Sequence, residues 1–359
     1  MKRLGNSELT ENITVERNVG RVEYIDALKG VAIFLVVLGH IVSCDENFYR
    51  LFNLIYSFHM PLFMFLAGCT TVLSYGRNTG TDGVYLRKRF VNIMVPYFAW
   101  SLLIPLLFTR SFDRAAWYSI LQKTFVTNRM FWFLPTLYGL IVAYVCYRRI
   151  RDGLRNRSEW CRENIKADFV LEGISCVMVV AVITVFMLLT GYQLFRDIVG
   201  FTIPFFAAVI YMENEWVHSL FHKRASFVAA LLIYIFLIGR FDFNRIAVTT
   251  SLLRMLLGMC AVVVLQQVFL KQRITRIINT QLMFWGHYSL LIYILHAQMI
   301  GISRLLTRNF PNRVTTLLWY CLISILSCYV CSVIAAALEH IPIVRTVLLG
   351  KKGDCYVKR

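Results

Sequence analysis

Ten apolar runs, most of them close to twenty residues long, constrain what this chain can fold into. They lie at residues 24–44, 50–75, 90–109, 131–147, 169–190, 197–212, 226–239, 249–270, 281–303 and 315–338. A helix of about 20 apolar residues crosses a bilayer core of roughly 30 Å, and within lipid its backbone polar groups are paired inside the helix. The hydrophobic share of 58% leaves little polar surface for a soluble fold of this length. The sequence therefore predicts an all-α integral membrane protein with about ten transmembrane helices.

Basic residues in the connections predict the orientation of these helices. If the N-terminus lies in the cytoplasm, the cytoplasmic connections hold 25 Lys and Arg residues and the outer connections hold 11, counting Arg50 at the outer edge of the second run. Because positive charge is retained on the cytoplasmic side, both termini are expected there. The same placement assigns the net charge of +18 to the membrane surface and not to a nucleic-acid partner. The strongly basic connection 148–168 is expected to lie along anionic lipid headgroups.

The first predicted span carries ionisable side chains near both of its ends. Asp26 and Lys29 lie near its start and His40 near its end. Lys29 and His40 are eleven residues apart, so on a helix they share one face about 16 Å apart. Ionisable groups inside a membrane are costly and usually mark a functional path, and the nearby small residues suggest a pocket wall: Gly30, Ala32 and Gly39. The alternative is that Lys29 reaches the headgroups while His40 is interfacial.

Four stretches resemble the membrane-bound acyltransferase family 3. The first stretch is Ile25–Gly30 followed by His40. In that family a basic residue, commonly Arg, precedes a catalytic His, and here Lys29 stands in the place of that basic residue. In the second, Phe58–Gly68 reads FHMPLFMFLAG, close to the family's FHMPLFFFLSG. The third and fourth are FWFLPTLY at 131–138 and WGHYSLLIYILH at 285–296. The resemblance covers about residues 22–340.

The resemblance implies a domain organisation. An acyltransferase transmembrane domain is expected over 22–340, after a polar cytoplasmic segment at 1–21 and before a basic cytoplasmic tail at 341–359. We expect the tail to be disordered from residue 345. The N-terminus lacks the apolar core of a signal peptide, and no appended hydrolase-like domain is expected.

The activity implied is that of a membrane O-acyltransferase, with acetyl as the favoured group. It would take the acyl group from acyl-coenzyme A and place it on a hydroxyl of a glycan, a lipid-linked saccharide or another extracytoplasmic acceptor. The enzyme would lie in the bacterial cytoplasmic membrane, with no bound cofactor and no metal. His40 would act as general base, since an imidazole can take a proton near neutral pH, and Lys29 would hold the phosphate-bearing end of the donor. A covalent acyl-His intermediate is the rival mechanism.

Further site residues are expected, some within these four stretches and some outside them. Arg87 and Arg89, at the cytoplasmic mouth of the third span, are interpreted as donor-phosphate ligands, although the positive-inside rule also explains them. Pocket-lining or substrate-binding roles are predicted for Asp26, His59, Arg254, Tyr293 and His296. For His59 the alternative is a histidine satisfied near the outer interface. Arg254 could instead snorkel outward, and Tyr293 and His296 could serve helix packing alone. Cys328 and Cys331 form a CxxC pair inside a span and are interpreted as packing residues.

Two other functional classes use similar residues. A proton- or anion-coupled transporter also needs intramembrane Lys, His and Arg, but the sequence shows no internal repeat and no matching broken helices. A purely structural protein leaves the shared face of Lys29 and His40 unexplained. Release of free thiol from acetyl-coenzyme A would distinguish an acyltransferase from both.

Overall fold

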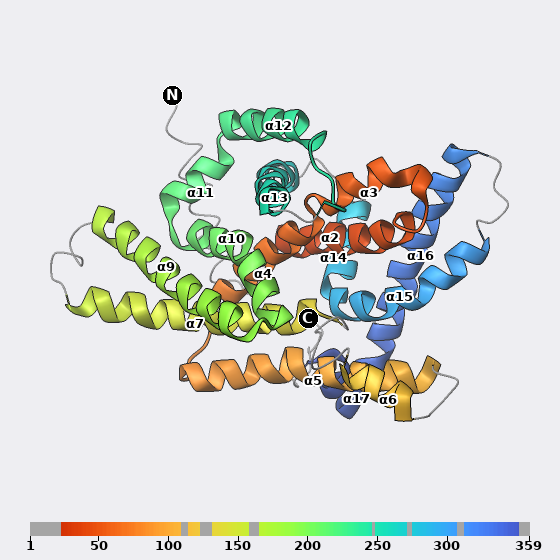
Figure 1. The fold of residues 1–359 in the computed structure, drawn as a ribbon, viewed down its shortest axis with the longest axis horizontal. Helices are drawn as coiled ribbons and strands as arrows, with labels where there is room; N and C mark the ends of the chain where they lie inside the picture. The colour runs from red at the N-terminus through yellow and green to blue at the C-terminus, as the bar shows by residue number, and fades with distance from the viewer. Residues whose placement is uncertain are drawn as a thin grey trace. The chain divides into compact units, whose positions relative to one another are not determined.

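In the computed structural model of the protein, residues 23–108, 114–122, 131–157, 165–245, 248–270, 275–306 and 312–351 are described, and every regular element in them is helical (Figure 1). The chain divides into two compact units. Unit 1 comprises Met1–Leu66 and Glu215–Ser332, and unit 2 comprises Ala67–Asn214 and Val333–Arg359. The predicted all-α class is confirmed.

Seven helices in the described part of the chain are long and apolar enough to cross a membrane. They are Glu23–Val42, Glu46–Gly76, Asp82–Leu107, Val170–Thr190, Gln193–Glu213, Thr249–Leu270 and Arg313–Leu338. An eighth results if Glu215–His222 and Arg224–Ile238, bent by 68° at their junction, form one span. The predicted runs at 131–147 and 281–303 are not among these spans. The first belongs to a helix that continues into charged sequence, and the second is divided at Tyr288. The inside location of both termini stays a prediction.

Helix α2 (Glu23–Val42) organises unit 1 by packing against α3, α13, α14 and α15 (Figure 1). The other elements of this unit are η1 (Glu46–Phe48), α3 (Tyr49–Tyr56), the start of α4 (His59–Gly76), α11 (Glu215–His222), α12 (Arg224–Ile238), α13 (Val248–Leu270), α14 (Arg276–His287), α15 (Ser289–Leu306) and most of α16 (Arg313–Leu338). Twelve of the twenty residues of α2 are buried, so this helix presents only a narrow accessible strip. Cys328 and Cys331 are free and fully buried in α16, as expected of packing residues.

Two glycines allow α2 and α14 to approach closely. A Cβ added to Gly30 would lie 2.0 Å from the backbone oxygen of Leu282, and one added to Gly286 would lie 1.9 Å from the backbone oxygen of Asp26. The interpretation of Gly30 and Ala32 as a pocket wall is therefore wrong, because Gly30 meets another helix and Ala32 is fully buried. Close backbone contact at small residues is a common way for membrane helices to associate.

The second predicted span is broken before its proline. Helix α3 ends at Tyr56 and α4 begins at His59, so Pro61 lies in the first turn of α4, where its missing N–H group costs little. The proline-containing run thus holds a break between two helices. The break places Tyr56 at the end of α3 and His59 at the start of α4, and these two residues are three positions apart in sequence.

Unit 2 contains the rest of α4, α5 (Asp82–Phe108), α6 (Arg114–Leu121), α7 (Phe133–Arg157), α9 (Ile165–Thr190), α10 (Gln193–Glu213) and α17 (Pro342–Leu349). Within it, α5 packs against α7 and α17, while α7 packs against α9 and α10.

The basic tail begins with a packed helix. Trp100 Nε1 donates a hydrogen bond of 2.9 Å to the backbone oxygen of Leu348, and α17 ends at Leu349 and is capped by Gly350, which has φ 64°. A Cβ on Gly350 would lie 1.9 Å from the backbone oxygen of Asn92. The expected disorder from residue 345 is therefore wrong for 345–351, and 352–359 lie outside the described residues.

Candidate active site

His40 lies in the last turn of α2, where side chains from two other helices meet it. Its imidazole ring centroid is 4.9 Å from that of His296 on α15, with the planes inclined by 42°. The hydroxyl of Tyr56 on α3 is 3.4 Å from His40 Nδ1. His40 is partly exposed, whereas His59 and His296 are 2% and 5% exposed. The histidine that a substrate can reach is therefore His40.

The backbone fixes the tautomers of the two buried histidines. His59 Nδ1 lies 2.8 Å from the backbone oxygen of Ile55, and His296 Nδ1 lies 2.6 Å from that of Tyr293 and 3.2 Å from that of Ile292. A carbonyl oxygen can only accept a hydrogen bond, so each Nδ1 carries the proton. In the neutral ring, Nε2 then carries the lone pair. Both buried histidines thus present an acceptor nitrogen on the side away from their own backbone.

Arg254 supplies a buried cation to the same region. Its Nε atom is inaccessible to solvent, and its guanidinium carbon lies 5.8 Å from the centroid of the Phe243 ring. The charge of Arg254 acts electrostatically on Tyr56 and His59. Arg254 as a whole is partly exposed, and its site role stays a prediction.

A short loop between α12 and α13 brings Phe243 against the aromatic rings of α3. The Phe243 ring centroid lies 4.7 Å from that of Tyr56 and 5.3 Å from that of Phe52. The backbone nitrogen of Phe243 donates to Asn53 Oδ1 at 3.0 Å, and the Tyr49 hydroxyl donates to the Asp242 carboxylate. Hydrogen bonds from Tyr49 and from the Asn244 backbone hold the pKa of Asp242 below its usual value. Sequence analysis missed both Tyr56 and Phe243, since aromatic residues near a span end are ordinarily explained as interface anchors.

Tyr293 lies one turn before His296 on α15, and their ring centroids are 6.0 Å apart. Tyr293 is partly exposed, which suits the predicted pocket-lining role.

Lys29 and Asp26 form a separate charged pair near the start of α2. Lys29 Nζ is 3.5 Å from Asp26 Oδ1, and the two side chains are 20% and 14% exposed. Because α2 is one continuous helix, Lys29 lies about 16 Å along it from His40. The structure thus brings His40, His59, Arg254, Tyr293 and His296 together in unit 1, and it leaves Asp26 and Lys29 three turns away.

The two predicted donor ligands of unit 2 differ in their surroundings. Arg87 is exposed on α5. Arg89 is partly buried: its Nε donates to the Tyr85 hydroxyl at 3.2 Å, its guanidinium contacts Ser74 Oγ, and its Cζ lies 5.3 Å from the Tyr85 ring centroid. Arg87 can therefore meet a ligand directly, while Arg89 is held by the protein.

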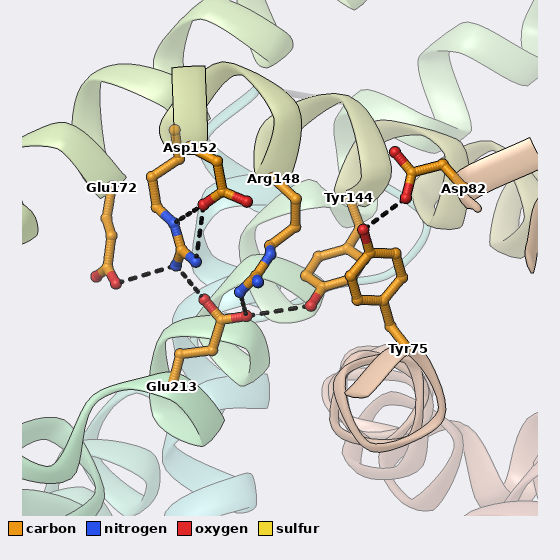
Figure 2. A network of polar contacts seen from close by, with 8 residues as sticks. Tyr75, Asp82, Tyr144, Arg148, Asp152, Glu172 and Glu213 are labelled. Carbon is orange, nitrogen blue, oxygen red and sulfur yellow. Dashed lines mark hydrogen bonds and ion pairs between the residues drawn. The ribbon is translucent and has the colours of Figure 1, made fainter. Parts of the chain in front are cut away.

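Arg148 and Arg151 enter an ionic network in unit 2 that Figure 2 shows from close by. Glu213, at the end of α10, accepts from Arg148 Nη1 at 3.0 Å, from Arg151 Nη1 at 2.5 Å and from the Tyr144 hydroxyl at 3.1 Å. Arg151 also lies 3.5 Å from Glu172 on α9. Burial works against the charge of Arg148, but Glu213, Tyr144 and Asp152 together outweigh it and the pKa of Arg148 is raised.

This network corrects the interpretation of the basic connection. Its first part was expected to lie along lipid headgroups, yet Arg148 and Arg151 are paired with carboxylates that join α7, α9 and α10. Arg149 pairs with Asp82 at 2.5 Å, although its own side chain is 70% exposed. Residues 158–164 lie outside the described part.

The arrangement in unit 1 suits proton transfer beside a buried positive charge. It combines an accessible imidazole, two neutral imidazoles of fixed tautomer, a phenol hydroxyl and a guanidinium. Such a set can take a proton from a hydroxyl and return it to a leaving group. Within the described residues, no group of three or more His, Cys, Asp and Glu side chains is arranged to hold a metal ion.

Comparison with known proteins identifies the family model that this chain matches. The model described as an acyltransferase domain, of the acyltransferase 3 family, matches residues 22–336. A nodulation protein, NolL of Sinorhizobium fredii, is 37% identical over 91 residues, which is 22% of this chain and 23% of that protein. The chain thus matches less than a quarter of the length of this relative. No solved structure gives a significant match.

Proposed function

Because the chain belongs to the acyltransferase 3 family and is a multi-pass membrane acyltransferase, we propose that it O-acylates an extracytoplasmic saccharide. The donor is acyl-coenzyme A, with acetyl as the favoured group, and the acceptor is a hydroxyl of a glycan or lipid-linked saccharide. The membrane is the bacterial cytoplasmic membrane. The alternative of a transporter loses its support, since the family matches over most of the chain.

One observation carries the proposal: the accessible imidazole of His40 faces the buried His296 at 4.9 Å and the hydroxyl of Tyr56. His40 lies near the predicted outer end of α2, the end at which an extracytoplasmic hydroxyl would arrive. A general base must be accessible to its substrate and must carry a free lone pair. Of the three histidines in this site, His40 meets the first condition best.

The proposed reaction is direct acyl transfer. The acceptor oxygen attacks the thioester carbonyl carbon while His40 takes the hydroxyl proton. The carbon–sulfur bond then breaks, and the sulfur of coenzyme A leaves with the proton returned by His40. Arg254 is proposed to stabilise negative charge on the carbonyl oxygen or on an anionic substrate group, since a buried cation acts strongly in a water-poor site.

The remaining residues are proposed to bind the substrates. Lys29, about 16 Å nearer the predicted cytoplasmic end, would hold the phosphate-bearing end of the donor, with Asp26 orienting it through their 3.5 Å contact. Arg87 and Arg89 would contribute further positive charge to donor binding. His59, Tyr293 and His296 would line the acceptor side.

The experiment uses purified protein and acetyl-coenzyme A, with release of free thiol as the readout. His40→Ala should lower acyl transfer by about 10²–10⁴-fold, the usual contribution of a general base. His40→Gln should fail as well, because an amide does not accept a proton at neutral pH. Lys29→Ala should raise the donor concentration required, and Lys29→Arg should retain activity if charge and reach suffice.

The matched control is His340→Ala, which removes an exposed histidine after α16. It should release thiol at the wild-type rate. Wild-type transfer by well-folded His40→Ala would refute the base assignment. The mass of surface glycans, compared with and without the protein, would identify the acceptor through a missing acyl group.

A further inference from the structure

We propose that Tyr56 is the positioning residue of His40, and this inference rests on the proposed function. The Tyr56 hydroxyl lies 3.4 Å from His40 Nδ1, and their rings meet edge to face with centroids 6.1 Å apart. Tyr56 is the last residue of α3, so its hydroxyl reaches α2 from a different helix. This contact fixes one nitrogen of the imidazole and leaves the other to act on the substrate.

Three aromatic rings hold the Tyr56 ring in place. Its centroid lies 4.2 Å from that of Phe52, 4.6 Å from that of His59 and 4.7 Å from that of Phe243. Aromatic pairs at such distances stabilise a defined relative geometry beyond their burial. A phenol held on several sides can direct its hydroxyl more accurately than a mobile side chain can.

Gly39 gives Tyr56 access to this position. A Cβ added to Gly39 would lie 3.0 Å from Tyr56 Cε2 and 3.6 Å from its Cδ2. The residue before His40 therefore has no side chain at the point where the Tyr56 ring rests on α2. Even a methyl group there would push the ring, and with it the hydroxyl, by a few tenths of an ångström.

His40 differs from its two neighbouring histidines in the group that its Nδ1 meets. Nδ1 of His59 and Nδ1 of His296 are each bound by a backbone oxygen of their own helix. Nδ1 of His40 instead lies 3.4 Å from the hydroxyl oxygen of Tyr56, which comes from another helix. If the Tyr56 oxygen accepts from His40 Nδ1–H, then Nε2 carries the lone pair that a general base requires.

The same contact stabilises the charged form of His40 during the reaction. When Nε2 takes the acceptor proton, the Nδ1–H bond to the phenol oxygen becomes a hydrogen bond from a cation, which is stronger than its neutral counterpart. Other titratable or charged groups at this site are His59 from α4, Arg254 from α13, His296 from α15 and Cys44 beyond the end of α2. Tyr56 contacts the imidazole of His40 and is also within electrostatic reach of the charge of Arg254.

The test replaces Tyr56 with Phe, which keeps the ring and its packing and removes the hydroxyl. Turnover at saturating acetyl-coenzyme A should fall by about 10–100-fold, since a hydrogen bond to a charged group is worth roughly one to two powers of ten in rate. The KM for acetyl-coenzyme A should stay within about twofold of the wild-type value. The acid limb of the kcat/KM profile should move to lower pH, because the His40 imidazolium loses the phenol oxygen that accepts its hydrogen bond and is therefore less stable.

Tyr234→Phe is the matched control. It removes a phenol hydroxyl from the same unit, one that bonds to Ser57 Oγ at 2.8 Å, and it should leave turnover and the pH profile unchanged. Gly39→Ala is a second, independent perturbation that keeps every polar group and displaces the Tyr56 ring. It should lower turnover in the same sense, with KM for the donor again preserved.

The outcomes separate this inference from the proposed function. If His40→Ala is inactive while Tyr56→Phe keeps wild-type turnover and an unshifted pH profile, the positioning role is refuted and the base assignment stands. If His40→Ala retains wild-type transfer, the proposed mechanism fails and the role of Tyr56 fails with it. If Tyr56→Phe and Tyr234→Phe lose turnover equally without a pH shift, the effect is general loosening and the inference is overturned.

Discussion

Replacing Gly286 with Ala tests whether close contact between α2 and α14 holds the first helix in place. The added Cβ would lie 1.9 Å from the backbone oxygen of Asp26, whereas ordinary contact begins near 3.4 Å. The two helices must therefore separate locally by roughly 1.5 Å, because backbone atoms cannot rotate away as a side chain can. Overpacking of this kind typically costs about 1–3 kcal/mol, and more where backbone must move.

The measurement is thermal unfolding of the purified protein in detergent, followed in parallel with donor binding. At about 2–4 °C per kcal/mol, the midpoint should fall by several degrees. The donor requirement should rise too, since Asp26 contacts Lys29 at 3.5 Å and moves with the displaced turn. The matched control is Gly200→Ala in α10, where an added Cβ meets nothing within 4 Å and where Ala favours the helix by up to about 1 kcal/mol. Equal midpoints for the two variants would refute the argument.

Two other predictions concern unit 2. Replacing Arg87 and Arg89 together with Gln should raise the KM for acetyl-coenzyme A while turnover at saturating donor persists, and the exposed Arg157→Gln should change neither value. Equal loss at every donor concentration would assign the pair to catalysis or folding. Glu213→Ala should lower the free energy of unfolding by about 3–5 kcal/mol, because it leaves two guanidinium groups without their shared carboxylate. Asp152→Ala, at a side chain 50% exposed, should change it by less than about 0.5 kcal/mol, and similar shifts for both would contradict the role of Glu213.

The sequence predicted the helical membrane fold because long apolar runs leave few alternatives in lipid. It also singled out His40, His59, Arg254 and His296 as site residues, because their polar side chains stand out within apolar runs; that these residues lie near one another is seen only in the structure. The spacing of Lys29 and His40 on one face required only that α2 be continuous, and it is.

What the sequence did not predict depends on contacts between distant segments. Gly30 and Gly286 are 256 residues apart in number, and only the packed helices show that they lie at one helix contact. Glu213 is far in sequence from Arg148 and Arg151. The sequence therefore indicated a headgroup contact for the basic connection, whereas the structure pairs both arginines with Glu213. Tyr56 resembled any aromatic residue near a span end, and its role emerges only from its distance to His40.

Three histidines in one site would be redundant as bases if their surroundings were alike, and the backbone makes them different. His59 and His296 are almost fully buried, and each already donates its Nδ1 proton to a carbonyl oxygen. Taking up a second proton would place a full charge on a buried ring beside Arg254 or beside another imidazole, which low-dielectric surroundings strongly disfavour. His40 is accessible, and its Nδ1 meets a phenol oxygen that tolerates either charge state of the ring. The proposed division of roles therefore follows from burial and hydrogen bonding: in the proposed mechanism His40 would exchange the proton, while His59 and His296 would stay neutral.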